Sequence, residues 1–226
     1  MSTSRPVPTG AAPSRCVVVV PVKPPAFGKS RLVGMTDEHR QELAKAFALD
    51  TVRAAASTPG VEAVLVVTDD FRLAAAMRAL GCAVMPDGAS DDVNATLVQA
   101  AAEVVRRWPD AVPVALCADL PALRPAELGE VLTDAVEHVA TGRAVFVRDR
   151  AGVGTTMYAA PADRFAPSFG LDSAARHADA GAVEVGSHAS SVRTDVDDLA
   201  DLGAALVAGV GPHTSRASGR RATPLG

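Results

Sequence analysis

The stretch that decides the fold runs from Val17 to Leu32 and reads VVVVPVKPPAFGKSRL. Four consecutive valines are typical of a strand that is buried on both faces, as found inside a parallel sheet. The loop after it contains Gly28 and three cations, Lys23, Lys29 and Arg31. Glycine lets backbone N–H groups approach an anion closely, and the cations neutralise its charge. The stretch therefore predicts a polyphosphate-binding loop, with an ordinary solvated basic turn as the alternative.

This loop matches the P-loop motif only in part. Gly28, Lys29 and Ser30 fit the end of that motif, but the motif requires a glycine five positions before Gly28, where Lys23 stands. We therefore predict a phosphate loop of another kind. A kinase or a P-loop switch is disfavoured for the same reason.

Length and composition favour one α/β domain, although two small ones would also fit 226 residues. Hydrophobic residues make up 48% of the chain and aromatic residues 4%, so the core should be aliphatic. The formal net charge of −4 argues against a general nucleic-acid or anionic-membrane binder.

The cysteines and the apolar runs favour a cytoplasmic protein. Cys16, Cys82 and Cys117 lie scattered in apolar segments, an odd set that indicates free buried thiols and not a disulfide or zinc framework. No apolar run approaches the length of a membrane span, and the N-terminal segment lacks the apolar centre of a signal peptide.

Strand-like and helix-like segments alternate along the chain. We predict a disordered tail over 1–15, a single domain over 16–209 and a second disordered tail over 210–226. Predicted strands cover 16–22, 63–67, 83–85 and 112–117, and predicted helices cover 37–57, 71–80, 92–107 and 126–140. This succession predicts a mostly parallel central sheet with helices on both faces, a Rossmann-like arrangement.

The pattern changes after residue 143 and predicts a mixed C-terminal half. Segments 144–147 and 155–159 look like strands, and the loop between them is short enough for an antiparallel hairpin. A short helix near 172–180, a strand near 183–185 and a helix near 199–208 should follow.

Acidic residues gather where predicted strands end. Asp119 follows the apolar segment 114–117, and strand one delivers Lys23 to the same edge of the sheet. In open α/β sheets, ligands bind outside the carboxyl ends of the strands. Asp119 is therefore a ligand-binding candidate, with a helix cap or turn former as the alternative.

A second acidic group lies near the end of the chain. Asp195 and Asp197 alternate with period two, which places both carboxylates on one face if the segment is extended. Two such charges repel each other unless a cation lies between them. Together with Asp119 they form a set of oxygen donors that would suit Mg²⁺. The alternative is that Asp197 and Asp198 cap the last helix, and we expect Asp197 to serve partly as a cap.

Two helix starts provide further candidates. Asn94 could bind a nucleoside hydroxyl, although helix capping by Asp91 or Asp92 explains that segment equally well. A helix that begins after Phe169-Gly170-Leu171-Asp172-Ser173 exposes N–H groups, so this segment predicts an anion pocket. Ser173 and His177 share one face of this helix, and Thr155 could supply another donor.

Several of these motifs occur in the same order in one family. They are KPPAFGKSRL, TDD, VNATL, ADLP, GVGTT, FGLDSAARH and DVDDLADL. In these the chain resembles the guanylyltransferases of deazaflavin coenzyme (F-420) biosynthesis, over roughly residues 16–206, and FG..S...H with DVD is the most specific part. The resemblance implies a nucleotidyltransferase fold. The Ala-, Arg- and Asp-rich, Lys-poor composition suggests a GC-rich actinobacterial genome. Within this family, that favours the mycobacterial type, which uses phosphoenolpyruvate.

The resemblance also assigns roles to individual residues. It places phosphoenolpyruvate against Thr155, Gly170 and Ser173, and Mg²⁺ at Asp119, Asp195 and Asp197. It places the GTP phosphates at Lys23, Gly28, Lys29 and Arg31, and the nucleoside at Asn94, with Asp87 as our choice for reading guanine. Asp119, Lys29 and Arg31 would be catalytic. The first loop departs from related nucleotidyltransferases, which carry more glycine where this chain has Pro24 and Pro25.

We therefore expect a cytoplasmic enzyme that transfers GMP from GTP to phosphoenolpyruvate, with possible hand-over of the product to the next enzyme of the pathway. The alternatives are the same reaction on 2-phospho-L-lactate or 3-phosphoglycerate, and a non-catalytic nucleotide-binding module.

Overall fold

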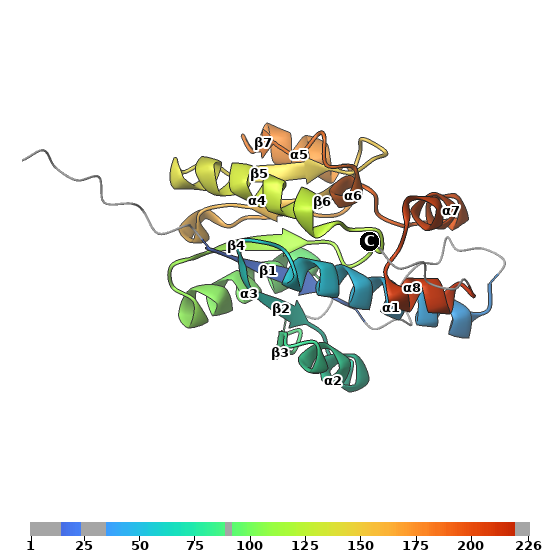
Figure 1. Ribbon diagram of the computed structural model, residues 1–226. Helices are drawn as coiled ribbons and strands as arrows, with labels where there is room; N and C mark the ends of the chain where they lie inside the picture. Colours follow the sequence, from blue (N-terminus) through green and yellow to red (C-terminus); the bar gives the residue numbers. More distant parts are fainter. Residues whose placement is uncertain (1–14, 24–34, 89–91, 220–226) are drawn as a thin grey trace, which may run out of the picture.

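The computed structural model describes residues 15–23, 35–88 and 92–219. A seven-stranded sheet runs through the molecule in the order β3-β2-β1-β4-β6-β5-β7 (Figure 1). The strands are β1 (Arg15–Pro21), β2 (Val61–Val67), β3 (Ala83–Met85), β4 (Ala111–Leu116), β5 (Val145–Arg148), β6 (Thr155–Ala159) and β7 (Val183–Glu184). The helices are α1 (Asp37–Ala56), α2 (Phe71–Ala79), α3 (Val93–Arg107), α4 (Pro125–Ala140), α5 (Ser173–Asp179), α6 (Ser190–Arg193), α7 (Leu199–Ala208) and α8 (Pro212–Ala217).

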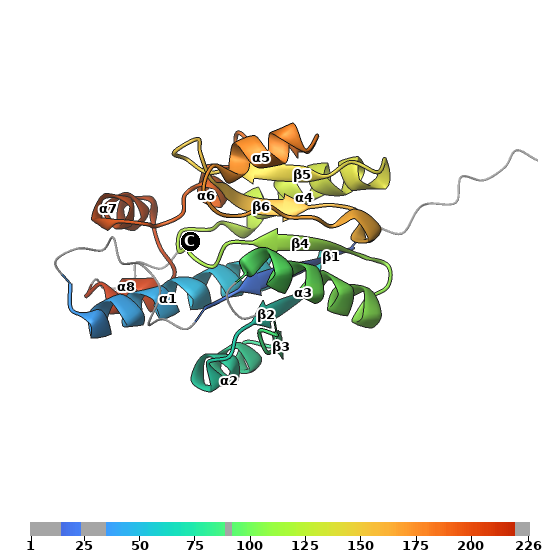
Figure 2. The same ribbon diagram turned by 180° about the vertical axis from the view of Figure 1, so that it is seen from behind.

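The valines of β1 lie at the centre of the fold. This strand pairs in parallel with β2 on one side and β4 on the other, and β3 extends the parallel part beyond β2. Val18 and Val20 pack toward α1, α2 and α4, whereas Val17 and Val19 pack toward α3. All four valines have zero exposure, so the strand is covered on both faces as predicted. Figure 2 shows α3 and α5 on the face opposite to α1 and α4.

The second half of the sheet is mixed. The strand β6 is antiparallel to both β4 and β5, and β7 is parallel to β5. The predicted hairpin of β5 and β6 is confirmed. Because β6 runs against β4, its first residues lie beside the carboxyl end of β4, where the Cys117 N–H donates to the Thr156 carbonyl at 2.8 Å. The loop of this hairpin therefore lies at the same edge of the sheet as the carboxyl ends of the parallel strands.

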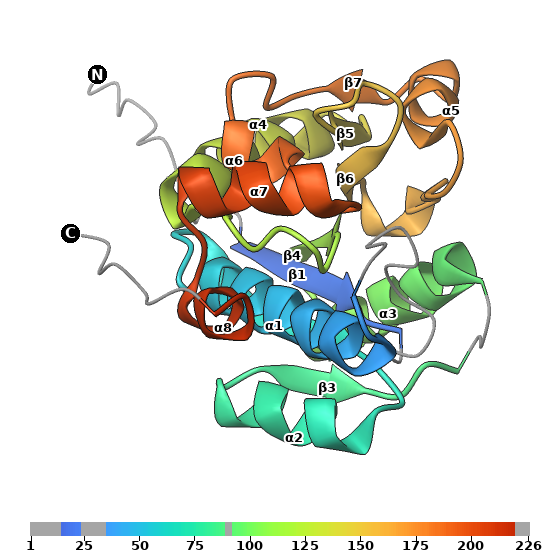
Figure 3. The same cartoon turned by 90° about the vertical axis from the view of Figure 1, so that its right-hand side faces the viewer.

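The predicted disordered tail from residue 210 is wrong for Pro212–Ala217, which forms α8 beside α1 (Figure 3). Buried Asp50 on α1 accepts hydrogen bonds from the backbone N–H groups of His213 at 3.1 Å and Thr214 at 2.7 Å. Gly211 is required at this contact, since a Cβ there would lie 2.3 Å from Cγ of Asp50. Sequence patterning missed the helix because its cap comes from a residue far away in the chain. Similarly, Arg15 already belongs to β1 and not to the predicted first tail.

Other predictions fall beyond the described residues. The remainder of the first tail and the basic loop with Gly28, Lys29 and Arg31 lie outside them, as does Asp91. Among the helices that the structure describes, none is both long enough and apolar enough to traverse a bilayer.

Candidate active site

A cleft of about 700 Å³ opens at the carboxyl edge of β1 and β4. It lies between the parallel half of the sheet and the segments that follow β5, β6 and α6. The predicted site residues among those that line it are Lys23, Asp119, Thr155, Gly170, Ser173, Asp195 and Asp197. The structure thus brings together side chains that are far apart in sequence, as the topology of an open α/β sheet requires.

Three carboxylates meet at one side of this cleft. Asp119, Asp195 and Asp197 each offer an oxygen, and these oxygens lie within 4.8 Å of one another. The N–H of Val196 donates to the Asp119 carbonyl at 3.0 Å, which ties the two segments together. Val196 itself is fully buried, so the residues on either side of it can face the cleft.

Capping of the following helix falls to a different residue. The side chain of Asp198 accepts from the N–H groups of Ala200 at 2.8 Å and Asp201 at 2.9 Å. Asp198 and Asp201 complete a capping box at the start of α7. The expectation that Asp197 serves partly as this cap is therefore wrong, whereas capping by Asp198, the other residue of that alternative, is confirmed.

The electrostatics of the carboxylate cluster favour a cation. Burial, followed by the charges of Asp119 and Asp197, raises the pKa of Asp195 to about 7, and Asp149 adds a smaller effect in the same direction. Such a group ionises readily only when a positive charge compensates it. Carboxylate oxygens in this number are the donors that hard divalent cations prefer. The residues present therefore fit a divalent metal ion.

The hairpin loop on the other side of the cleft is shaped by Asp149. Its buried carboxylate accepts three backbone N–H bonds, from Gly152 at 2.6 Å, Val153 at 3.0 Å and Gly154 at 2.8 Å. This arrangement holds the loop so that β6 begins with Thr155 at the cleft. Sequence reasoning missed Asp149, although an aspartate followed by two spaced glycines is a turn signal that could have indicated it.

The predicted anion pocket begins at Gly170. This residue has a φ of 119°, which favours glycine, and Asp172 has a φ of 52°. These conformations turn the chain sharply into α5, whose first residue, Ser173, is buried and lines the cleft. The expected juxtaposition of Thr155, Gly170 and Ser173 is therefore present.

Asn94 makes contacts that the sequence did not indicate. Its side-chain oxygen accepts from the Phe169 N–H at 2.7 Å, and its amide nitrogen donates to the Phe169 carbonyl at 3.1 Å. The alternative of capping by Asp92 is confirmed, since its side chain accepts from the Asn94 N–H at 2.9 Å. Asn94 thus joins α3 to the loop that carries Gly170.

Asp87 also has protein partners. Its carboxylate accepts from the Thr96 hydroxyl at 2.6 Å, and its N–H donates to Asp69 at 3.0 Å. Neither Asp87 nor Asn94 is among the described residues that line the cleft. Their roles in reading the nucleoside therefore remain predictions, as do those of Gly28, Lys29 and Arg31.

Two solved structures with the same fold are nucleotidyltransferases. One is a CMP:2-keto-3-deoxy-manno-octonic acid synthetase in complex with CTP, with a TM-score of 0.55 and 18% identity over 86% of this chain and 99% of that chain. Another is a 4-diphosphocytidyl-2C-methyl-D-erythritol synthase from Anaerococcus prevotii, with a TM-score of 0.53 and 7% identity over 87% and 95%. They confirm the predicted fold class.

Comparison of sequences gives closer relatives. A phosphoenolpyruvate guanylyltransferase of Streptomyces coelicolor is 48% identical over 206 residues, which are 90% of this chain and 95% of that protein. One of Mycolicibacterium vanbaalenii is 42% identical over 211 residues, again 90% and 95%. The family model described as "Guanylyl transferase CofC like" matches residues 16–217. The chain therefore belongs to the CofC-like guanylyl transferase family.

Proposed function

We propose that this protein transfers GMP from GTP to phosphoenolpyruvate, which yields enolpyruvyl-diphospho-5'-guanosine and pyrophosphate, as a step of deazaflavin coenzyme biosynthesis in the cytoplasm. The observation that carries the proposal is that one cleft holds both a cluster of three carboxylates and a separate pocket suited to an anion. A nucleotide-binding module alone would not need the second pocket. The names of the two relatives described above support the choice of acceptor.

The reaction requires positioning more than acid–base chemistry. A phosphate oxygen of phosphoenolpyruvate attacks the α-phosphorus of GTP, a new P–O bond forms, and the bond to pyrophosphate breaks on the opposite side. The attacking oxygen is already ionised near neutral pH, so no side-chain base is needed. The main barrier is repulsion between two polyanions, which the protein lowers by holding them in line and neutralising their charge.

Residues on the two sides of the cleft would have different roles in binding and neutralising the substrates. Asp119, Asp195 and Asp197 would hold Mg²⁺, which supplies charge neutralisation for the reacting phosphates when bound. Thr155, Gly170 and Ser173 would bind the acid, and Lys23 would face the GTP phosphates at the end of β1. From the family resemblance, Lys29 and Arg31 would stabilise the departing pyrophosphate.

Replacement of Asp119 by Asn tests the proposal. The change keeps the size of the side chain and removes one negative charge from the cluster, so turnover should fall to background while the far-UV circular dichroism spectrum stays unchanged. Asp134→Asn on the exposed face of α4 is the matched control and should keep full activity. Near-normal turnover by Asp119→Asn would contradict the site.

The acceptor is tested with the wild-type protein. GTP and Mg²⁺ are incubated with phosphoenolpyruvate, 2-phospho-L-lactate or 3-phosphoglycerate, and pyrophosphate and the product mass are measured. Because the expected product is labile, each reaction is run with and without the next enzyme of the pathway, which also tests hand-over. Pyrophosphate release that requires both GTP and phosphoenolpyruvate supports the proposal, whereas preference for another acid overturns the choice of acceptor. The absence of release with every acid would favour a binding module.

A further inference from the structure

His177 lies buried directly behind the anion pocket. It is 1% exposed and stacks against the rings of Phe146 and Tyr158, at centroid distances of 5.7 and 4.8 Å. Both ring nitrogens have partners: Nε2 lies 2.9 Å from the Ser168 backbone nitrogen, and Nδ1 lies 3.0 Å from Oγ1 of Thr155. Burial lowers the pKa of His177 to about 4, so the ring is neutral at pH 7.

The two contacts determine which nitrogen carries the proton. A backbone N–H can only donate, so Nε2 accepts the bond from Ser168 and has no hydrogen. A neutral imidazole has one N–H group, which must then be on Nδ1.

The tautomer in turn determines the role of the Thr155 hydroxyl. Its oxygen faces a nitrogen that carries a hydrogen, so the oxygen accepts and cannot donate to His177. Within the described part of the chain, His177 is its hydrogen-bond partner, and Thr155 lines the cleft. The hydroxyl hydrogen is therefore left for a ligand in the cleft.

We propose that His177 is a positioning residue that keeps the Thr155 hydroxyl as a hydrogen-bond donor toward the anionic acid substrate. The identity of that acid as phosphoenolpyruvate rests on the proposed function. An anion accepts hydrogen bonds only, so a hydroxyl that donated to the ring would turn its lone pairs toward the ligand and repel it. A donor held in place before binding avoids this loss and the cost of reorientation.

The tautomer is tested on the wild-type protein without any substrate. Nitrogen-15 NMR of the histidine rings distinguishes a protonated nitrogen from a bare one, and His177→Asn assigns the His177 signals among the five histidines. We expect Nδ1 protonated and Nε2 bare across about pH 5 to 8. A proton on Nε2 at neutral pH would overturn the inference, whatever the acid is.

The consequence for binding is tested with four single variants and one double variant. The affinity for phosphoenolpyruvate is measured by calorimetry with Mg²⁺ present. Thr155→Val should weaken binding about 10- to 100-fold, because a hydrogen bond to a charged group is lost, whereas Thr155→Ser should keep it. His177→Phe keeps a ring in the aromatic stack but removes both nitrogens, and we expect about a tenfold loss.

Coupling between the two sites separates positioning from a merely structural role. If His177 acts through the hydroxyl, His177→Phe should cause little further loss of affinity in the Thr155→Val background, and His177→Asn, which retains an N–H donor, should recover part of the affinity. An equal loss in both backgrounds would overturn the inference. Binding of phosphoenolpyruvate without pyrophosphate release would contradict the proposed function alone, whereas unchanged affinity in Thr155→Val with normal turnover would contradict the inference alone.

Discussion

Asp195 has a side-chain carboxyl group whose ionised form is disfavoured by its surroundings. Burial and the neighbouring carboxylates raise its pKa to about 7 from an ordinary value of 3.8. The unfolded chain releases this proton near pH 4, while the folded, metal-free protein retains it to near pH 7. The folded state binds more protons in this interval, so the group makes the protein less stable as the pH rises from about 4 to about 7.

Asp195→Asn should remove this decrease in stability with rising pH, because the amide stays neutral. In the metal-free state, the free energy of unfolding of the variant should match wild type near pH 4. It should exceed wild type above pH 7 by on the order of 2–4 kcal/mol. Urea unfolding at several pH values, with a chelator present, gives the difference.

Asp134→Asn on exposed α4 is the control and should follow wild type throughout. With excess Mg²⁺, wild type should be more stable than Asp195→Asn. A bound ion stabilises the folded wild-type protein through three carboxylates, whereas the variant offers only two. If the free energy of unfolding of Asp195→Asn and of wild type changed in parallel with pH, the pKa of Asp195 would not be raised in the folded protein.

The Asp149 loop gives a prediction at the scale of elements. A Cβ at Gly154 would lie 2.4 Å from Oδ2 of Asp149, so Gly154→Ala must displace the carboxylate that holds the loop. We expect a loss of about 1–3 kcal/mol of stability and weaker binding of the acid, because the loop determines where Thr155 lies. Thermal unfolding and calorimetry with phosphoenolpyruvate measure the two effects.

Gly203 provides the matched glycine. It lies within α7 with nothing within 4 Å of an added Cβ, so Gly203→Ala should be neutral or stabilising by up to about 1 kcal/mol. Equal behaviour of the two alanine variants would mean that the contact between Gly154 and Asp149 carries no strain.

The cap of α8 gives a second prediction at this scale. Asp50→Ala leaves two backbone N–H groups of α8 without their acceptor, and the expected cost is about 1–3 kcal/mol. Urea denaturation measures it. Asp134→Ala, also an aspartate within a helix but exposed, should change stability by less than about 0.5 kcal/mol. A similar small change for Asp50→Ala would show that α8 is held by its apolar contacts alone.

Most elements could be predicted because their determinants are local. The valines of β1 and the helical periodicity of α1 and α3 depend on neighbours a few residues away, and the structure has them close to the predicted bounds. Asp119, Asp195 and Asp197 could be predicted as a group because the carboxyl ends of strands meet at one edge.

What the sequence did not predict depends on distant partners. Asp50 caps a helix 163 residues away, and Asn94 binds the backbone of Phe169, 75 residues away. Buried His177 and Asp149 likewise act on groups that only the folded sheet brings near. Periodicity carries no information about such contacts, so polar residues of this kind look like ordinary caps or turn residues in a sequence.

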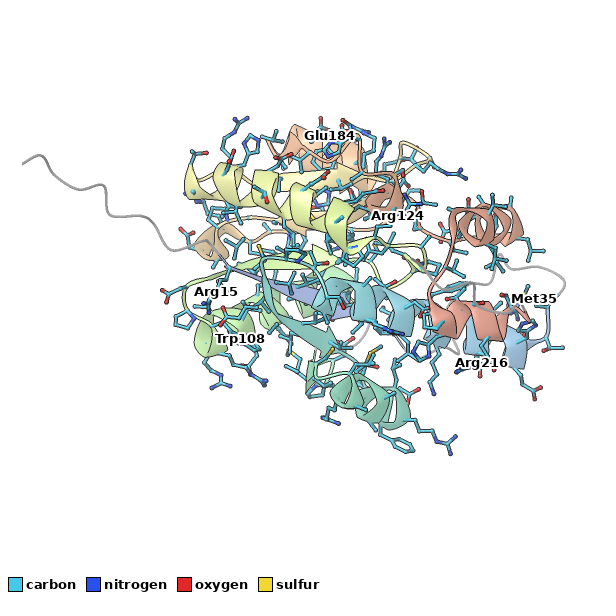
Figure 4. All side chains as sticks on the ribbon, viewed as in Figure 1. Arg15, Met35, Trp108, Arg124, Glu184 and Arg216 are labelled. Carbon is cyan, nitrogen blue, oxygen red and sulfur yellow. The ribbon has the colours of Figure 1, made fainter. Side chains whose placement is uncertain are left out.

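The whole molecule should unfold as one unit, because a continuous sheet joins its two halves. Unfolding can be followed separately in each half, since the chain has one tryptophan and one tyrosine. Trp108 follows α3 on the side of the parallel strands (Figure 4). Tyr158 lies in β6 of the mixed half. Urea curves from Trp108 fluorescence and Tyr158 absorbance should coincide within error. Two separate midpoints would show that the mixed half unfolds independently.

The reversal of strand direction between β4 and β6 has a consequence for how the two substrates are encoded. It brings the β5–β6 loop to the edge where the parallel strands end, so residues 149–177 would bind the acid, while the strand ends up to Asp119 would face the nucleotide. A chimera that exchanges residues 149–177 between family members is therefore expected to use a new acceptor acid, while its donor stays GTP.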